Sequence, residues 1–130
     1  MGISSDGVLA FGFPVGGEDE APEWLLNTDG KEVGFEEYAC GEWDFENVPY
    51  AQRAKDLAAC PADLVLFCSY EYPMYLLVVR GTTLTAARGD CVDVDDFEVS
   101  AEKISAFRTW CEGRGIEWQE PKWRLVSMYG

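Results

Sequence analysis

The chain has 130 residues, of which 24 are acidic, 10 are basic and none is histidine, and its net charge is -14. Apolar residues make up 48% of the sequence. This fraction is above the range of disordered chains, so we expect a single folded domain over residues 1–130. The absence of histidine excludes Ser-His-Asp and Cys-His catalysis as well as histidine metal sites.

The acidity is concentrated near the beginning of the chain. The first 46 residues hold half of the carboxylates but only one of the basic residues, Lys31. A surface of this sign repels phosphate, so we expect no direct nucleic-acid binding and favour a basic protein surface as the partner. Stretch 15–47 mixes Gly, Pro and acidic residues with scattered aromatics, which predicts an acidic, loop-rich segment packed on the body.

Targeting signals and cysteines point to the cytosol. The start, MGISSDG, has no basic region followed by an apolar run, and no apolar stretch approaches the roughly 20 residues that cross a bilayer. We therefore expect no membrane contact. The five cysteines include no C-x-x-C pair, which indicates reduced and mostly buried thiols. Cys68 and Cys111 lie in apolar contexts, and we interpret both as core residues.

The first half of the chain predicts one strand and one helix. Residues 8–14 form an apolar run between a turn signal and Pro14, which is typical of a strand. A helix is predicted from Val48-Pro49, with Asn47 as its cap, to the residue before Pro61. The helix residues expected to face inward are Tyr50, Ala54, Leu57 and Ala58.

The second half predicts a strand-rich region around another helix. Runs 63–69 and 74–80 read as consecutive central strands or a hairpin, and 84–88 as a further short strand. Ser100 is expected to cap a helix that runs to about residue 112, with Ile104, Phe107 and Cys111 on its inner face. Residues 123–129 complete the pattern as a last strand. The predicted fold class is α+β, a mostly antiparallel sheet of about five strands with two helices packed on it.

Three blocks carry a resemblance to a known group of proteins: SSDGVLAFGF, FCSYEYPMYLL and WRLVSMYG. They resemble blocks in small uncharacterised proteins of actinobacteria and their phages. The resemblance implies a mobile-element origin and the cytoplasm of a bacterial host, and it transfers no catalytic residue. Small acidic phage proteins are often inhibitors of host defence, including anti-CRISPR and anti-restriction proteins that imitate the charge of DNA.

Other features leave alternatives open. The acidic run at 90–98 lacks the spacing of a calcium loop, and we interpret it as a solvated loop. Carboxylates at 36 and 37, or at 42, 44 and 46, favour an alternative function as a small carboxylate-dependent enzyme or ligand-binding protein. Cys68 is the strongest candidate for a thiol nucleophile, although a core position is favoured. A phage structural or assembly protein is a third possibility.

The main hypothesis is a non-enzymatic acidic binding protein that inhibits a host nucleic-acid-binding defence complex. It requires no cofactor, no metal and no catalytic residue, and the sequence leaves the oligomeric state open. Carboxylates would compete with phosphate for basic grooves, and tyrosines beside a turn would add contact area. The residues expected to contact the partner are Glu18, Asp19, Glu20, Glu36, Glu37, Glu42, Asp44, Glu46, Tyr70 and Tyr72.

Overall fold

The structure is a computed structural model, and it describes residues 5–17, 20–26, 29–32, 34, 35, 38, 50–69, 73–94 and 97–129. Within these residues the chain forms a five-stranded sheet, two α-helices and a 3-10 turn. In chain order the elements are β1 (Ser5–Val15), η1 (Glu23–Leu25), α2 (Tyr50–Ala59), β2 (Ala62–Cys68), β3 (Pro73–Val79), β4 (Leu84–Ala86), α3 (Ala101–Gly113) and β5 (Lys122–Tyr129). The predicted α+β fold class is confirmed.

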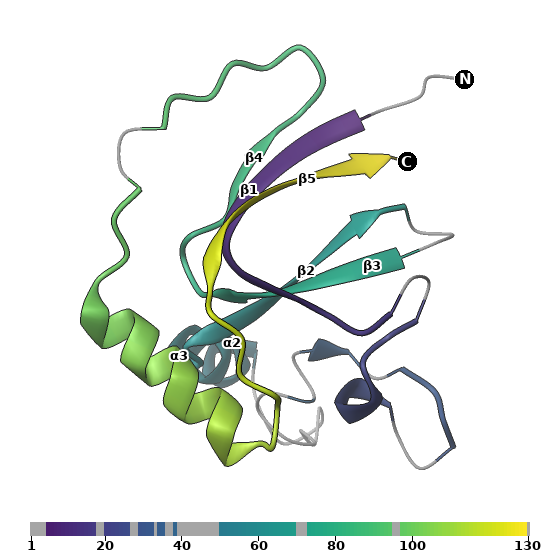
Figure 1. The fold of residues 1–130 in the computed structure, drawn as a ribbon, viewed down its shortest axis with the longest axis vertical. Coiled ribbons are helices and arrows are strands. Elements are labelled where there is room, and N and C mark those ends of the chain that lie inside the picture. The colour runs from purple at the N-terminus through teal and green to yellow at the C-terminus, as the bar shows by residue number, and fades with distance from the viewer. Residues whose placement is uncertain are drawn as a thin grey trace.

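The sheet closes on itself. Its strand order is β3-β2-β5-β1-β4, and because β1 also pairs with β3, the strands β1, β3, β2 and β5 form a ring. The pairings of β1 with β3, β4 and β5, and of β2 with β3, are antiparallel. β2 and β5 run parallel and meet at Cys68 and Met128, so the sheet is mixed rather than mostly antiparallel. Figure 1 shows both helices at one end of the sheet.

The predicted strands all form, with small shifts at their ends. The run 8–14 lies within β1, and the runs 63–69 and 74–80 form the β2–β3 hairpin. β4 is shorter than predicted, and β5 begins one residue earlier, at Lys122. β3 is central as expected, whereas most of β2 is only half-buried.

β1 changes partner along its length. Its first half lies between β4 and β5, and from Gly12 onward it pairs with β3. At Gly12 the two backbones are so close that a Cβ atom would lie 2.6 Å from the Cα of Val78 and 2.9 Å from the carbonyl carbon of Leu77. No side chain fits at that distance, so the crossing of β1 over β3 requires glycine.

β3 is covered on both faces, and its alternating side chains enter two different clusters. The cluster on the helix side consists of Phe13, Cys60, Ala62, Leu77, Val79, Phe107, Cys111 and Ile116. The cluster inside the ring consists of Ala10, Leu76 and Val78, with Val65, Phe67 and Val126 around it. Full burial of a large apolar side chain stabilises a fold by about 1.5–3 kcal/mol. The continuous apolar run of β3 is what a strand with two covered faces requires.

Helix α3 follows the sequence signals closely. The Ser100 side chain accepts a hydrogen bond from the Lys103 backbone N–H at 3.2 Å, which is the predicted N-cap. Phe107 and Cys111 are fully buried against the sheet, and Ile104 is half-buried. The predicted inner face of this helix is therefore confirmed.

Helix α2 forms where predicted, but its inner face was wrongly predicted. Ala54 and Ala58 are exposed and Leu57 is half-buried, while the side chain of Tyr50 lies outside the described residues. The described residues of α2 enter neither core cluster. The helix is joined to the body at its C-terminal end, where Cys60 is buried, so the alanines remain in solvent.

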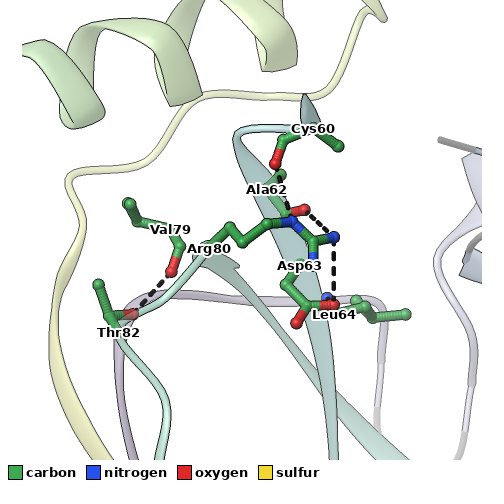
Figure 2. A network of polar contacts seen from close by, with 7 residues as sticks. All are labelled: Cys60, Ala62, Asp63, Leu64, Val79, Arg80 and Thr82. Carbon is green, nitrogen blue, oxygen red and sulfur yellow. Dashed lines mark hydrogen bonds and ion pairs between the residues drawn. The ribbon is translucent and has the colours of Figure 1, made fainter. Parts of the chain in front are cut away.

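Arg80 bridges the junction between α2 and β2 with hydrogen bonds (Figure 2). Its Nε donates to the carbonyl of Cys60 at 2.8 Å and its Nη2 donates to the carbonyl of Ala62 at 2.9 Å. The same nitrogen lies 3.8 Å from a carboxylate oxygen of Asp63. A guanidinium satisfies two backbone carbonyls at once because its donors form a planar fork. The end of α2 is thus tied to the hairpin.

Replacing Gly12 with alanine should destabilise the protein by about 2–4 kcal/mol, because the new methyl group overlaps the backbone of β3. Gly7→Ala is the matched control on the same strand, since the atom nearest to its added Cβ is the Ala86 carbonyl oxygen at 4.0 Å. That variant should change stability by less than about 1 kcal/mol. Equilibrium unfolding in guanidinium chloride measures both, and equal losses would contradict the close crossing.

Candidate functional site

The structure describes only one of the residues expected to contact a partner. Glu20 is exposed and lies in a tight turn, where its backbone exchanges hydrogen bonds of 3.1 and 3.2 Å with Gly17. The other members of the set lie outside the described residues: Glu18, Asp19, Glu36, Glu37, Glu42, Asp44, Glu46, Tyr70 and Tyr72. The site must therefore be built from the side chains around the Glu20 turn.

A hollow of about 340 Å³ lies beside that turn. It is lined by Pro14, Val15, Gly16, Pro22, Glu23, Trp24, Ile116, Glu117 and Gln119. We call it the acidic hollow, because exposed carboxylates border it from two parts of the chain, Glu23 on η1 and Glu117 after α3. Trp24 and the prolines give it apolar walls.

The segment after α3 holds Glu117 at the hollow through its neighbours. Ile116 is buried, and the ring of Trp118 packs 5.7 Å from that of Phe13 and 5.5 Å from that of Phe107. Gln119 donates a hydrogen bond to the carbonyl of Pro14 at 3.1 Å. Alternate residues are anchored in this way, so Glu117 between them points to solvent.

Aromatic contacts hold the other wall. The ring of Trp24 packs 4.8 Å from that of Tyr38, which in turn lies 6.1 Å from that of Trp110 on α3. The guanidinium of Arg114 stacks 4.8 Å from the Trp110 ring and 5.2 Å from the Tyr38 ring, and it donates to the Tyr38 carbonyl. Burial raises the pKa of Tyr38, and Arg114 opposes that rise. Trp24 is thereby fixed against α3.

Two further contacts anchor the segment that carries η1. Leu25 is fully buried. The hydroxyl of Tyr75, on the buried strand β3, donates a hydrogen bond to a carboxylate oxygen of Glu32 at 2.9 Å. Tyr75 is buried, and its hydroxyl connects the core to an acidic residue of the segment.

Arginine side chains in the described part of the chain make contacts within the protein. No carboxylate there is buried. Several arginines instead contact the protein itself: Arg80 the carbonyls of Cys60 and Ala62, Arg108 the ring of Trp118, Arg114 the ring of Trp110, and Arg124 the carbonyl of Gly12. These arginines are half-buried or exposed, as the carboxylates are. The sign of the surface follows from the excess of 24 acidic over 10 basic residues.

Of the four described cysteines two are buried and two, Cys68 and Cys91, are exposed, so the prediction of mostly buried thiols is met by only half of them. Cys60 and Cys111 are buried, and burial, with the neighbouring Cys60 and Glu112, raises the pKa of Cys111 to about 12. A raised pKa disfavours the nucleophilic thiolate. The interpretation of Cys68 as a core residue is wrong, because its thiol is exposed at the last position of β2, where the backbone φ is 72°. No group of three Cys, Asp or Glu side chains suited to a metal occurs among the described residues.

Sequence reasoning missed Glu23 and Glu117 as members of a common site. The alternation of apolar and polar residue types at 116–119 was a sequence signal for the exposure of Glu117. The sequence does not reveal that Glu117 lies near η1, because the two segments are far apart in the chain and only the fold places both at the acidic hollow.

Comparisons with protein-family models, with curated proteins and with solved structures find no match to this chain. No helix in the described ranges is both long enough and apolar enough to cross a membrane.

The Tyr75–Glu32 contact predicts a loss of stability at high pH. Burial, followed by the hydrogen bond to Glu32 and its charge, raises the pKa of Tyr75 to about 12, against about 10 in an unfolded chain. The folded protein keeps a proton that the unfolded chain releases between these values, so this contribution is complete below pH 10 and lost as the pH rises to 12.

Urea unfolding of the wild type and of Tyr75→Phe over pH 9–12 measures this contribution. The stability of the wild type should fall by about 2–3 kcal/mol more than that of the variant, because only the wild type carries this titration. Other groups that titrate in the range are common to both proteins. Parallel pH profiles would show that Tyr75 loses its proton at the same pH in the folded and the unfolded protein, and would contradict the raised pKa.

Proposed function

We propose that this protein is a non-enzymatic acidic binding protein that docks on a basic surface of a nucleic-acid-binding partner. The observation that carries the proposal is the acidic hollow, where Glu23 and Glu117 border a recess with Trp24 in its wall. A partner that presents arginine or lysine side chains for phosphate would meet carboxylates there instead.

The chemistry of the hollow suits a guanidinium or an ammonium group. Carboxylates supply charge-assisted acceptors, and an aromatic face attracts a cation by about 0.5–2 kcal/mol, depending on how far it is desolvated. The protein uses this combination within its own fold, where Arg108 both donates to Glu112 at 2.8 Å and lies 5.4 Å from the Trp118 ring. A partner arginine at Trp24 and Glu23 would repeat this arrangement.

Exposure of the carboxylates favours binding over catalysis. A catalytic carboxyl is commonly tuned by burial or by a close like charge. Glu23 and Glu117 are both exposed, so water solvates each of them. This environment suits electrostatic docking, which is fast and is weakened by salt.

The proposal also specifies the biological partner. The resemblance of three blocks to proteins of actinobacteria and their phages supports a host nucleic-acid-binding defence complex, met in the host cytoplasm. The protein would act as an inhibitor that competes with DNA or RNA for the same basic groove. Its net charge of -14 supplies the long-range attraction.

The test is recovery of the partner from an actinobacterial lysate on immobilised protein, followed by competition with labelled duplex DNA. The wild type should retain a nucleic-acid-binding complex at low salt, release it at high salt, and displace the DNA. The double variant Glu23→Lys/Glu117→Lys should lose at least about tenfold in affinity, because two contacts change from attractive to repulsive.

The matched control is Asp93→Lys/Glu102→Lys, which changes the net charge equally but away from the hollow. Both of its carboxylates are exposed, so the fold should tolerate the change. Its affinity should fall by less than about threefold at moderate salt, where distant charges are screened. Equal losses in the two double variants would show that overall charge, and not the hollow, determines binding. Recovery of no nucleic-acid-binding complex would overturn the proposed function.

A further inference from the structure

The side chains that line the acidic hollow are rich in hydrogen-bond acceptors. Glu23 and Glu117 contribute carboxylates, and neither lysine nor arginine is part of the lining. Gln119 adds a third acceptor, because its Nε2 donates to the carbonyl of Pro14 at 3.1 Å and its Oε1 stays available. A ligand that satisfies these groups must carry positive charge and several hydrogen-bond donors.

The acceptors come from two separate segments of the chain. Glu23 belongs to η1, whereas Glu117 and Gln119 lie between α3 and β5. A ligand that pairs with both segments needs donors that point in different directions. A guanidinium group provides them, since it is a planar fork of N–H donors with no acceptor. The ammonium group of lysine is compact and strongly hydrated, so it gains less from such a lining.

The walls of the hollow suit the rest of an arginine side chain. Trp24 is half-buried at the hollow, and an aromatic face attracts a flat guanidinium. The apolar wall residues that can cover the methylene stem are Pro14, Val15, Pro22 and Ile116. The volume of about 340 Å³ lies at the small end of the range of ligand pockets. The hollow thus has the size of a site for one side chain.

The protein itself stacks exposed guanidinium groups on aromatic rings. Arg114 lies 4.8 Å from the Trp110 ring and 5.2 Å from the Tyr38 ring, and Arg108 lies 5.4 Å from the Trp118 ring. Both arginines are exposed. Stacked arginine in this fold therefore does not need a closed pocket, and an open hollow with a tryptophan in its wall offers the same environment.

We propose that the acidic hollow binds one arginine side chain of the partner and selects it over lysine. The guanidinium lies on the ring of Trp24 and pairs with the carboxylates of Glu23 and Glu117. This inference rests on the proposed function and specifies the group that the partner presents. Trp24 is then the specificity-determining residue, because both cations attract carboxylates but the flat guanidinium also stacks on the indole ring.

NMR titration of the ¹⁵N-labelled protein with the amides of N-acetyl-arginine, N-acetyl-lysine and N-acetyl-citrulline tests the selection. At an ionic strength of about 20 mM, where exposed charges are weakly screened, the arginine compound should shift the Trp24 indole N–H and the Glu117 amide saturably. It should bind at least about fivefold more tightly than the lysine compound. The citrulline compound has the same shape without the charge and should cause no saturable shift.

Three variants locate the contact. Glu117→Gln should weaken binding of the arginine compound at least about threefold, because a carboxylate acceptor is lost. Trp24→Phe keeps a ring beside Tyr38 but offers a weaker aromatic face, so the preference for arginine over lysine should fall below about twofold. Glu120→Gln is the control, since Glu120 is exposed and lies outside the lining, and it should change the affinity by less than about 1.5-fold.

Two results would overturn the inference. The first is equal affinity for the arginine and lysine compounds, which would leave the proposed function intact because either cation would serve docking. The second is an arginine affinity that Glu117→Gln and Glu120→Gln reduce equally, because binding would then be diffuse attraction to the acidic surface. Failure of the proposed function shows itself separately, as the absence of a nucleic-acid-binding complex among the proteins recovered from the lysate.

Discussion

The crossing of β1 over β3 at Gly12 is the constraint on which the rest of the structure depends. The backbones of the two strands approach too closely there for any side chain. Because they do, β1 can pair with β5 and β4 at its beginning and with β3 at its end, and the sheet closes into a ring. The closure gives β3 two covered faces, with Leu77 turned to α3 and Leu76 turned into the ring. A protein of this size obtains its two apolar clusters from that arrangement.

The same core positions the acidic surface. The hydroxyl of Tyr75 on β3 donates to Glu32, which follows η1 in the chain, and Phe13 of β1 packs on Trp118, the residue after Glu117. The side chains of Arg80 and Arg124 are half-buried, and both donate hydrogen bonds to backbone carbonyls. The exposed carboxylates, of which Glu23 and Glu117 border the acidic hollow, set the sign of this surface.

Local signals in the sequence predicted most of the helices and strands. They predicted few of the contacts that form the candidate site. Apolar runs bounded by turn residues located the strands, and the Ser100 cap with Phe107 on the inner face located α3, because these depend on neighbours in the chain. The ring could not be predicted, since a glycine in a strand does not reveal which backbone passes it. Ala54 was misplaced because helical spacing shows a possible apolar face and not whether anything covers it. Glu117 was missed because its neighbour Glu23 is brought to it only by the tertiary fold.

Hydrogen exchange of the backbone amides, measured residue by residue by NMR, tests the closed ring most directly. If the crossing at Gly12 holds the fold together, the paired amides of 12–15 and 75–79 should exchange only through global unfolding, with the free energy that denaturant unfolding gives. The amides of β4, a three-residue strand at the end of the sheet order, should exchange through local opening at lower free energy. Exchange of 12–15 at low free energy, while 75–79 and α3 stay protected, would show that β1 separates from β3 on its own and would contradict the account.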